Sequence, residues 1–223
     1  MKTLFLLSFF IMIFNAPTIS KNENCEWLHS GDVLVKAAMV EECKSEIAHL
    51  SISELSKLIS FAIVSSDLEA VSAIVYLDTE RALAANKVAP VNFIFLALNS
   101  PNKPLSVFQL LESIGVDVVN SQLGANNIAY YAIETGNIKI FEHLALSQKY
   151  NDLVNEDRNL LAAITAGDIK MLKALLKLGL NEQITDRSGC NMLDYAIAHN
   201  ELVIHEYLIR ELGMEKPLCK PSH

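Results

Sequence analysis

A motif that recurs every 31 to 35 residues constrains this chain more than any other feature of its sequence. Three segments superpose without gaps, and they begin at Ala132, Ala163 and Ala196, which are 31 and 33 residues apart. Two earlier copies begin at Ala62 and Ala97, each 35 residues before the next. A period of this length is typical of arrays in which each repeat is one supersecondary unit.

The copy at residues 163–181 shows what each repeat is predicted to form. A first helix ends, a Gly, Ser or Asn with a polar neighbour turns the chain, and a second helix follows. Apolar residues in the second helix recur at helical spacing, which indicates one buried stripe. The stripe contains Ile169, Leu172, Leu175 and Leu176, and the opposite face carries Lys170, Lys173 and Lys177. Gly179 is expected to end this helix.

Five such helix pairs predict an all-α helical solenoid. One short pair cannot bury its apolar face alone, whereas stacked pairs share a continuous core. No stretch of the sequence alternates apolar and polar residues in the manner of a half-buried strand.

The sequence of these repeats resembles a known family. Residues 163–168 (AITAGD), 175–181 (LLKLGLN) and 186–189 (DRSG) resemble the ankyrin repeat, whose pattern reads A-A-x-x-G-H, L-L-x-x-G-A-D and D-x-x-G. Residues 191–196 (NMLDYA) stand where that family has T-P-L-H-x-A. The sequence departs from that motif at its proline, replaced by Met192 and Ile128, and at its histidine, replaced by Asp194 and Tyr130.

The resemblance covers residues 53–213 and implies an ankyrin-type solenoid. A tetratricopeptide array has a similar period, but the large aromatic pattern of that family is missing here. We expect about five ankyrin-like repeats at residues 54–213, an N-terminal helical cap at residues 21–53 and a C-terminal tail at residues 214–223. Residues 33–40 and 46–50 look like the helical pieces of the cap, which should give the array a polar outer face.

Residues 1–20 have the pattern of a secretory signal peptide. Lys2 precedes an apolar run at residues 4–14 that only Ser8 interrupts, and the small residues Thr18 and Ser20 suit a cleavage site. The run is shorter than the roughly 18 residues that span a bilayer. We therefore expect an exported protein, periplasmic or secreted, without a membrane anchor after cleavage.

Four cysteines remain in the predicted mature chain. Export would place them in an oxidising compartment, where disulfides persist. Three pairings are possible, and closeness along the chain favours Cys25–Cys43 and Cys190–Cys219. Free buried thiols are the alternative, while a zinc site lacks a CxxC pair or a nearby histidine.

The charge of the chain limits its partners. The whole sequence has 18 basic and 26 acidic residues, a formal net charge of −8. Loss of Lys2 with the signal peptide leaves 17 basic against 26 acidic residues, or −9. Nucleic acids and anionic membranes bind mainly through Lys and Arg, so neither is an expected partner.

The sequence contains no pattern that predicts catalysis. The pair His205 and Glu206 begins like a metalloprotease helix but lacks the second histidine. Nucleophile elbows, phosphate-binding glycine loops and dinucleotide fingerprints are also missing from the sequence. We expect no enzyme, no metal and no cofactor, although an unfamiliar site assembled from distant repeats is the alternative.

Binding to another protein is what the resemblance implies. Ankyrin proteins use a concave surface whose variable positions flank the turn Asp and follow the Ala pair. Carried over to this chain, the predicted partner-binding residues are Glu134, Thr135, Thr165, Ala166, Thr185, Arg187, Ser188, Ala198 and His199.

Two classes of function fit these observations. The first is a monomeric, exported binding module that acts stoichiometrically, either as a periplasmic immunity or inhibitor protein or as a secreted effector. Its acidic charge would suit a basic target. The second is a stress-protective or structural periplasmic factor without a single tight partner, which an adjacent oxidative-stress gene would favour.

We predict that the mature protein begins near Lys21 and has no free thiol. The two favoured disulfides would close loops of about 18 and 30 residues, worth roughly 3 kcal/mol each in the chain-entropy description. Intact mass combined with thiol counting tests both expectations. Four free thiols in protein taken from the cell envelope would contradict the pairing.

Overall fold

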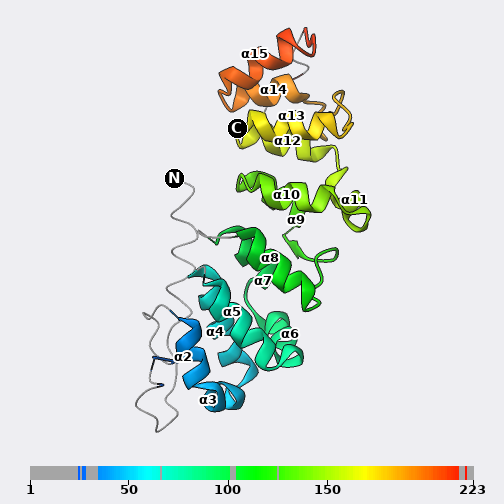
Figure 1. Cartoon of the computed structure of the whole chain (residues 1–223). Helices are drawn as coiled ribbons and strands as arrows, with labels where there is room; N and C mark the ends of the chain where they lie inside the picture. Colours follow the sequence, from blue (N-terminus) through cyan, green and yellow to red (C-terminus); the bar gives the residue numbers. More distant parts are fainter. Residues whose placement is uncertain are drawn as a thin grey trace. The chain divides into compact units, whose positions relative to one another are not determined.

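The computed structural model describes residue 25, residues 27–28, 35–65, 67–100, 104–124 and 126–215, and residue 219. The predicted signal peptide at residues 1–20 lies outside the described residues, as do parts of the predicted cap and tail. The chain forms two compact units, Met1–Val116 and Asp117–His223. Figure 1 shows their helices in sequence order.

The first unit is entirely helical in its described part. The helices α4 and α5 pack against each other, as do α7 and α8, and α4 also packs on α6 and α7. Its elements are α2 (Ala37–Glu42), α3 (Lys44–His49), α4 (Ile52–Val64), α5 (Leu68–Leu77), α6 (Thr79–Val88), α7 (Phe93–Leu98) and α8 (Pro104–Ser113).

The second unit contains three helix pairs and one short hairpin. The first helices α9, α12 and α14 pack side by side, and each packs on the second helix that follows it. Its elements are β1 (Gln122–Leu123), β2 (Asn126–Asn127), α9 (Ile128–Glu134), α10 (Ile138–Ala145), η2 (Gln148–Tyr150), α11 (Asn151–Val154), α12 (Arg158–Thr165), α13 (Ile169–Lys177), α14 (Met192–Ala198) and α15 (Leu202–Arg210).

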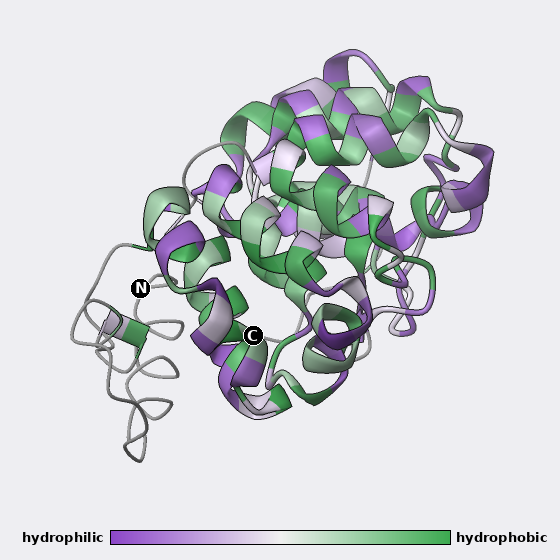
Figure 2. Cartoon of the chain, turned by 60° about the horizontal axis from the view of Figure 1, so that its bottom comes forward, coloured by the Kyte–Doolittle hydropathy of each residue, from purple (hydrophilic) through white to green (hydrophobic). Residues whose placement is uncertain are grey.

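These elements confirm the predicted all-α class, and the helix pairs lie where the sequence copies lie. The five pairs are α4–α5, α7–α8, α9–α10, α12–α13 and α14–α15. Extended structure in the described residues is limited to the antiparallel β1–β2 hairpin and a single bridge between Thr185 and Asn191. Figure 2 shows hydrophobic and hydrophilic segments alternating along the helices.

The turn inside each pair of the second unit has one geometry. The left-handed residues are Gly136, Gly167 and Asn200, with φ of 70°, 71° and 58°. In each turn the backbone N–H of the residue after the left-handed one donates a hydrogen bond to the carbonyl five residues earlier, in the first helix. The N···O distances are 2.8, 3.0 and 2.9 Å. This is a Schellman motif, which satisfies carbonyls that the helix end leaves unpaired.

Gly167 has a second reason to lack a side chain. A Cβ at this position would come within 2.8 Å of the carboxylate of Glu201, which lies in the equivalent turn of the next repeat. The fourth and fifth repeats therefore approach each other closely at their turns.

Asparagine begins the first helix in three of the repeats. Asn92, Asn127 and Asn191 occupy equivalent positions, and each side chain accepts a hydrogen bond from a backbone N–H of the first turn. Asp194 completes a capping box with Asn191, since its carboxylate accepts from the N–H of Asn191 at 2.7 Å. Asparagine thus supplies the N-cap that the family motif assigns to threonine.

The predicted buried stripe of α13 is confirmed for its central residues. Leu172 and Leu175 are fully buried, as is Met171, which the sequence pattern does not assign to the stripe. Lys173 is exposed as expected, but it is not isolated. Its Nζ lies 4.7 Å from the centroid of the Tyr207 ring on α15, a cation–π contact between neighbouring repeats.

The described part of the predicted cap is helical and carries one disulfide. The short helices α2 and α3 correspond to the pieces expected at residues 33–40 and 46–50. Cys25 and Cys43 are bonded, with Cα atoms 5.8 Å apart, as predicted. The guanidinium of Arg81 donates to the carbonyls of Ala48 and Leu50, which closes the end of α3.

The sequence pattern misses α6, the helix that carries Arg81. It begins after Asp78, whose carboxylate accepts from the N–H of Arg81 at 3.0 Å, and it buries Ala82 and Ala85. Aspartate followed by an alanine-rich segment is a helix-start signal, so the sequence did contain the information.

None of the helices in the described residues has both the length and the hydropathy that a membrane span needs.

We predict that Leu175→Ala lowers the free energy of unfolding by about 2–5 kcal/mol, because it removes a fully buried side chain. Denaturant unfolding monitored by circular dichroism measures this change. The matched control is Lys177→Ala, an exposed residue of the same helix, with an expected change within roughly 0.5 kcal/mol. Lys173 is a poor control because of its contact with Tyr207. Equal losses in both variants would show that the buried stripe is wrongly placed.

Candidate functional site

The turn before α14 is held together by Asp186. Its Oδ1 accepts hydrogen bonds from the N–H of Ser188 at 2.8 Å and of Cys190 at 2.9 Å. Its own N–H donates to the carbonyl of Cys190 at 2.9 Å. Gly189 has φ of 80°, in the left-handed region that favours glycine. Asp186 and Gly189 thus set the backbone geometry of this turn.

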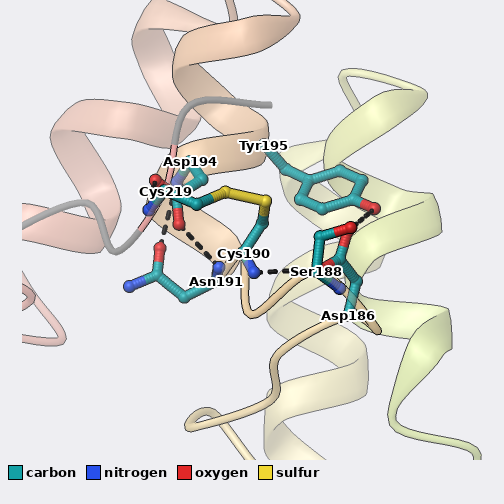
Figure 3. The surroundings of a disulfide bond; sticks show 7 residues. All are labelled: Asp186, Ser188, Cys190, Asn191, Asp194, Tyr195 and Cys219. Carbon is teal, nitrogen blue, oxygen red and sulfur yellow. Dashed lines mark hydrogen bonds between the residues drawn. A yellow bond between two sulfur atoms is a disulfide. The ribbon is translucent and has the colours of Figure 1, made fainter. Parts of the chain in front are cut away.

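Tyr195 connects this turn to the first helix of the fifth repeat. Its hydroxyl donates to Oδ2 of Asp186 at 2.9 Å, as Figure 3 shows. On its other side the ring stacks with His199, with centroids 6.1 Å apart and an interplanar angle of 22°. Tyr195 therefore joins two groups of predicted binding residues, one in the turn and one at the end of α14.

The pKa of Asp186 is lowered and the pKa of Tyr195 is raised. The N–H of Cys190 is the main cause that lowers the pKa of Asp186 below its ordinary 3.8, and the Tyr195 hydroxyl acts in the same direction. Burial raises the pKa of Tyr195 above 10.0, and the hydrogen bond to Asp186 adds to this effect. At neutral pH the tyrosine keeps its proton and the aspartate remains charged, so the hydrogen bond between them persists.

The third repeat repeats this arrangement with Tyr131. This residue stands at the same position in its repeat as Tyr195, and its hydroxyl donates to the carbonyl of Leu123 in β1 at 3.2 Å. Ala162 occupies the same position in the repeat between them. Because α12 packs between α9 and α14, a small side chain separates two tyrosines that are each tied to a hairpin or turn.

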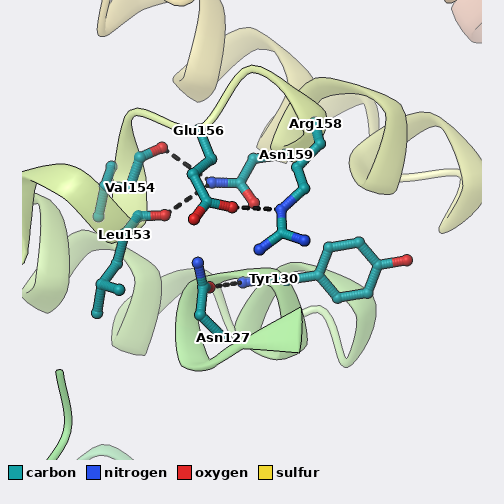
Figure 4. Close-up of polar contacts among 7 residues, drawn as sticks. All are labelled: Asn127, Tyr130, Leu153, Val154, Glu156, Arg158 and Asn159. Carbon is teal, nitrogen blue, oxygen red and sulfur yellow. Dashed lines mark hydrogen bonds and ion pairs between the residues drawn. The ribbon is translucent and has the colours of Figure 1, made fainter. Parts of the chain in front are cut away.

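Tyr130 and Arg158 extend this surface. The rings of Tyr130 and Tyr131 meet edge-on, with centroids 6.0 Å apart. Arg158 is paired with Glu156, and its guanidinium lies beside the Tyr130 ring in Figure 4. Burial is the main cause that raises the pKa of both tyrosines, so each keeps its hydroxyl proton at neutral pH. We call Tyr130, Tyr131, Arg158, Arg187, Tyr195 and His199, which lie on or at the end of the first helices α9, α12 and α14 or in the turn before α14, the hairpin face.

A buried asparagine, Asn159, fixes the backbone next to Arg158. The Nδ2 of Asn159 donates to the carbonyls of Leu153 at 3.1 Å and Val154 at 2.9 Å, at the end of α11 (Figure 4). These bonds satisfy carbonyls that the helix end leaves open. They also fix the start of α12, the helix that begins with Arg158.

The predicted binding residues fall into two groups. Thr135, Ala166 and His199 are the C-cap residues of three helices that pack side by side, and each is accompanied by the residue before it. The second group flanks the turn at Asp186. The exposed residues are Glu134, Thr135, Thr185, Arg187, Ser188 and His199, and the partly buried ones are Thr165, Ala166 and Ala198.

Sequence reasoning missed the three tyrosines. The family pattern treats the positions of Tyr131 and Tyr195 as free, and Tyr130 stands where the family has histidine. Tyr131 and Tyr195 are 64 residues apart, which is two repeat lengths. This spacing was the signal in the sequence that the two residues are equivalent. Their attachment to the hairpin and the turn becomes visible only in three dimensions.

A second polar cluster lies at the other side of the Asp186 turn. Cys190 and Cys219 form the predicted disulfide, with Cα atoms 5.1 Å apart. Asp194 is fully buried beside them, and its Oδ1 accepts from the N–H of Cys219 at 3.0 Å (Figure 3).

The sulfur atoms and the Asp194 carboxylate come within 4.8 Å of one another, a spacing that could suit a metal ion. However, a thiolate is the metal-binding form of cysteine, and these sulfurs are bonded to each other. Both carboxylate oxygens also accept backbone N–H groups. The cluster therefore fastens the tail to α14.

The hairpin face carries side chains of kinds that are common in protein interfaces. It presents three partly exposed tyrosine rings and the guanidinium of Arg187, which makes no ion pair or hydrogen bond in the described part of the chain. Tyrosine and arginine are enriched at the centres of protein interfaces.

No family model matches the sequence. A protein of fowlpox virus (strain NVSL) that is named as an ankyrin repeat protein is 30% identical to the chain over 97 residues. The matching segment covers 43% of this chain and 69% of the viral protein.

We predict that Asp186 titrates below pH 3.8. Because its pKa is lower in the folded than in the unfolded chain, the stabilisation is complete above about pH 4 and is lost as pH falls through the lowered value. The amide shifts of Ser188 and Cys190, followed by NMR during acid titration, report the midpoint. Asp186→Asn should remove this titration, and a midpoint at or above 3.8 would contradict the prediction.

Proposed function

The chain belongs to the ankyrin-repeat family, and we propose that it is a binding module that captures another protein through its hairpin face. Ankyrin repeats generally mediate interactions between proteins, which makes a protein the expected class of partner. We propose further that the chain acts stoichiometrically and not as an enzyme.

The observation that carries this proposal is the pair of equivalent tyrosines tied to the hairpin and the turn. Tyr131 and Tyr195 donate to Leu123 and Asp186, so their rings are held in place before a partner arrives. Ordering a flexible side chain on binding costs about 0.5–1.5 kcal/mol, and a side chain that is already held avoids most of this cost. A preorganised row of aromatic rings is therefore suited to binding.

Arg187 is the best candidate for an anchor on this face. It is exposed at the tip of the turn, while Asp186 and Gly189 carry the backbone geometry. Its planar guanidinium can engage a carboxylate with two parallel hydrogen bonds. The acidic net charge of −8 favours a basic target overall. Such a target would offer a local carboxylate or carbonyl to Arg187.

We propose that the protein acts outside the cytosol. Two disulfides fit an extracellular or otherwise oxidising compartment, and the signal-peptide pattern of residues 1–20 supports the same location. Occlusion of an enzyme or toxin in the periplasm, or modulation of a host protein after secretion, would both use the hairpin face in the same way. An adjacent toxin gene would favour the first of these roles.

The test begins with a pull-down of the oxidised chain from its own envelope fraction, followed by titration calorimetry of the captured protein. We expect Arg187→Ala to weaken binding by on the order of 2 kcal/mol or more, about thirtyfold in Kd. Its melting temperature should hardly change, because an exposed side chain at the tip of a turn buries little in the free protein.

The matched control is Lys177→Ala, which removes one exposed positive charge from α13 at a site away from the hairpin face. This variant should bind the captured protein as the wild type does. If Lys177→Ala weakens the complex and Arg187→Ala leaves it intact, the partner uses another surface and the proposal fails.

A further inference from the structure

The last repeat exposes a residue that the preceding repeats bury. Ile133, Ile164 and Ile197 occupy the same position in successive first helices. Ile133 and Ile164 are fully buried, because α12 and α14 pack against the helices that carry them. Ile197 is 49% exposed. In the described part of the chain no further helix pair follows α14 and α15 to cover it (Figure 1).

The outer face of α15 is also apolar. Leu202, Val203 and Ile209 are 71%, 68% and 43% exposed. Val203 stands where the two preceding repeats have Lys139 and Lys170, both exposed. The outer face of a solenoid is polar where it meets water, and the last described repeat instead replaces a lysine by valine. Exposed apolar residues that gather in one place mark an interaction surface.

A charged pair lies among these apolar residues. Arg210 Nη2 and Glu206 Oε1 are 2.8 Å apart, one helical turn from each other. The spacing of residues 202, 203, 206, 209 and 210 puts all five on one side of α15. We call the surface formed by Ile197, Leu202, Val203, Glu206, Ile209 and Arg210 the end face.

We propose that the end face binds a second copy of this chain through a two-fold axis, in place of the monomer expected from the sequence. In a two-fold interface the same patch serves both subunits, so each residue needs a counterpart that the same patch supplies. The end face has this property. Two α15 helices that cross about the axis bury their apolar residues together. They also bring Glu206 of each copy to Arg210 of the other. This register places the axis near residue 208, so Ile209 lies beside the axis and Leu202 and Val203 pack against the end of α15 in the second copy.

The charge order suits a second copy of the chain. One negative and one positive group sit one turn apart on the same stripe, and a two-fold rotation reverses their order. The opposite charges then face each other without any further residue being required. The apolar residues supply affinity, and the charges fix how the helices cross.

The experiment uses the full chain with both disulfides formed, analysed by sedimentation velocity over a series of concentrations. The wild type should convert from monomer to dimer as concentration rises. Leu202→Glu and Ile209→Glu should each raise the dimer Kd by at least about tenfold, because each places an unpaired carboxylate in the interface.

Leu146→Glu is the matched control. Leu146 is 89% exposed at the C-cap of α10, in a different repeat from the end face. The substitution makes the same chemical change and should leave the dimer Kd unaltered. Thermal melting of all three variants, followed by circular dichroism, establishes that they remain folded.

A charge exchange tests the two-fold geometry itself. Glu206→Arg and Arg210→Glu each create like charges on the end face, so each variant alone should dimerise more weakly than the wild type. A mixture of the two variants should form a heterodimer more tightly than either homodimer, because opposite charges then meet across the axis. The internal Glu206–Arg210 pair is exposed, so its loss should hardly affect folding.

Three outcomes would overturn the proposal. The first is a wild type that stays monomeric at every concentration. The second is a dimer that Leu202→Glu and Ile209→Glu leave intact. The third is a mixture of the charge variants that associates no better than its components. Binding of a captured partner through Arg187 is measured separately, so failure here leaves the proposed function standing.

Discussion

In the third, fourth and fifth repeats, the chain leaves the first helix through a residue with positive φ, and the next N–H returns to a carbonyl of that helix. The same bonds recur three times, so each pair of helices has the same internal geometry. Stacking depends on this constraint, because a repeat can share its core with a neighbour only if their apolar faces match. Gly167 carries two constraints, a left-handed backbone and close approach of Glu201.

Each end of the described array is fastened by a disulfide. A repeat with a described neighbour on one side only has fewer packing contacts to hold it in place. At the start, Cys25–Cys43 and the bonds from Arg81 hold the short cap helices. At the end, Cys190–Cys219 and the buried Asp194 hold the tail against α14. These fastenings hold the described end of the tail, while Ile197 and the outer side of α15 remain exposed. The contacts that stabilise the last described repeat therefore do not cover its end face.

The hairpin face shows how much of a proposed binding surface a sequence pattern can predict. The pattern placed Arg187 among the variable positions that flank the turn Asp, and the structure shows Arg187 exposed in a turn held by Asp186 and Gly189. It could not place the tyrosines, because a repeat pattern records which positions the backbone demands and leaves the others undefined. Tyr195 donates a hydrogen bond to Asp186 in the turn and stacks on the ring of His199. Both contacts depend on how α14 is oriented.

The sequence by itself predicted the helix pairs, their turns and the central residues of the buried stripe of α13, and closeness along the chain favoured the two cysteine pairings that the structure shows. These features are local or periodic, so spacing along the chain is enough to predict them. Only the tertiary structure decided that Lys173 meets Tyr207, that Tyr131 and Tyr195 are tied to a hairpin and a turn, and that Ile197 is exposed while Ile164 is buried. Each of these depends on what lies beside a residue in space, and identical positions in successive repeats have different neighbours because the array of described repeats ends.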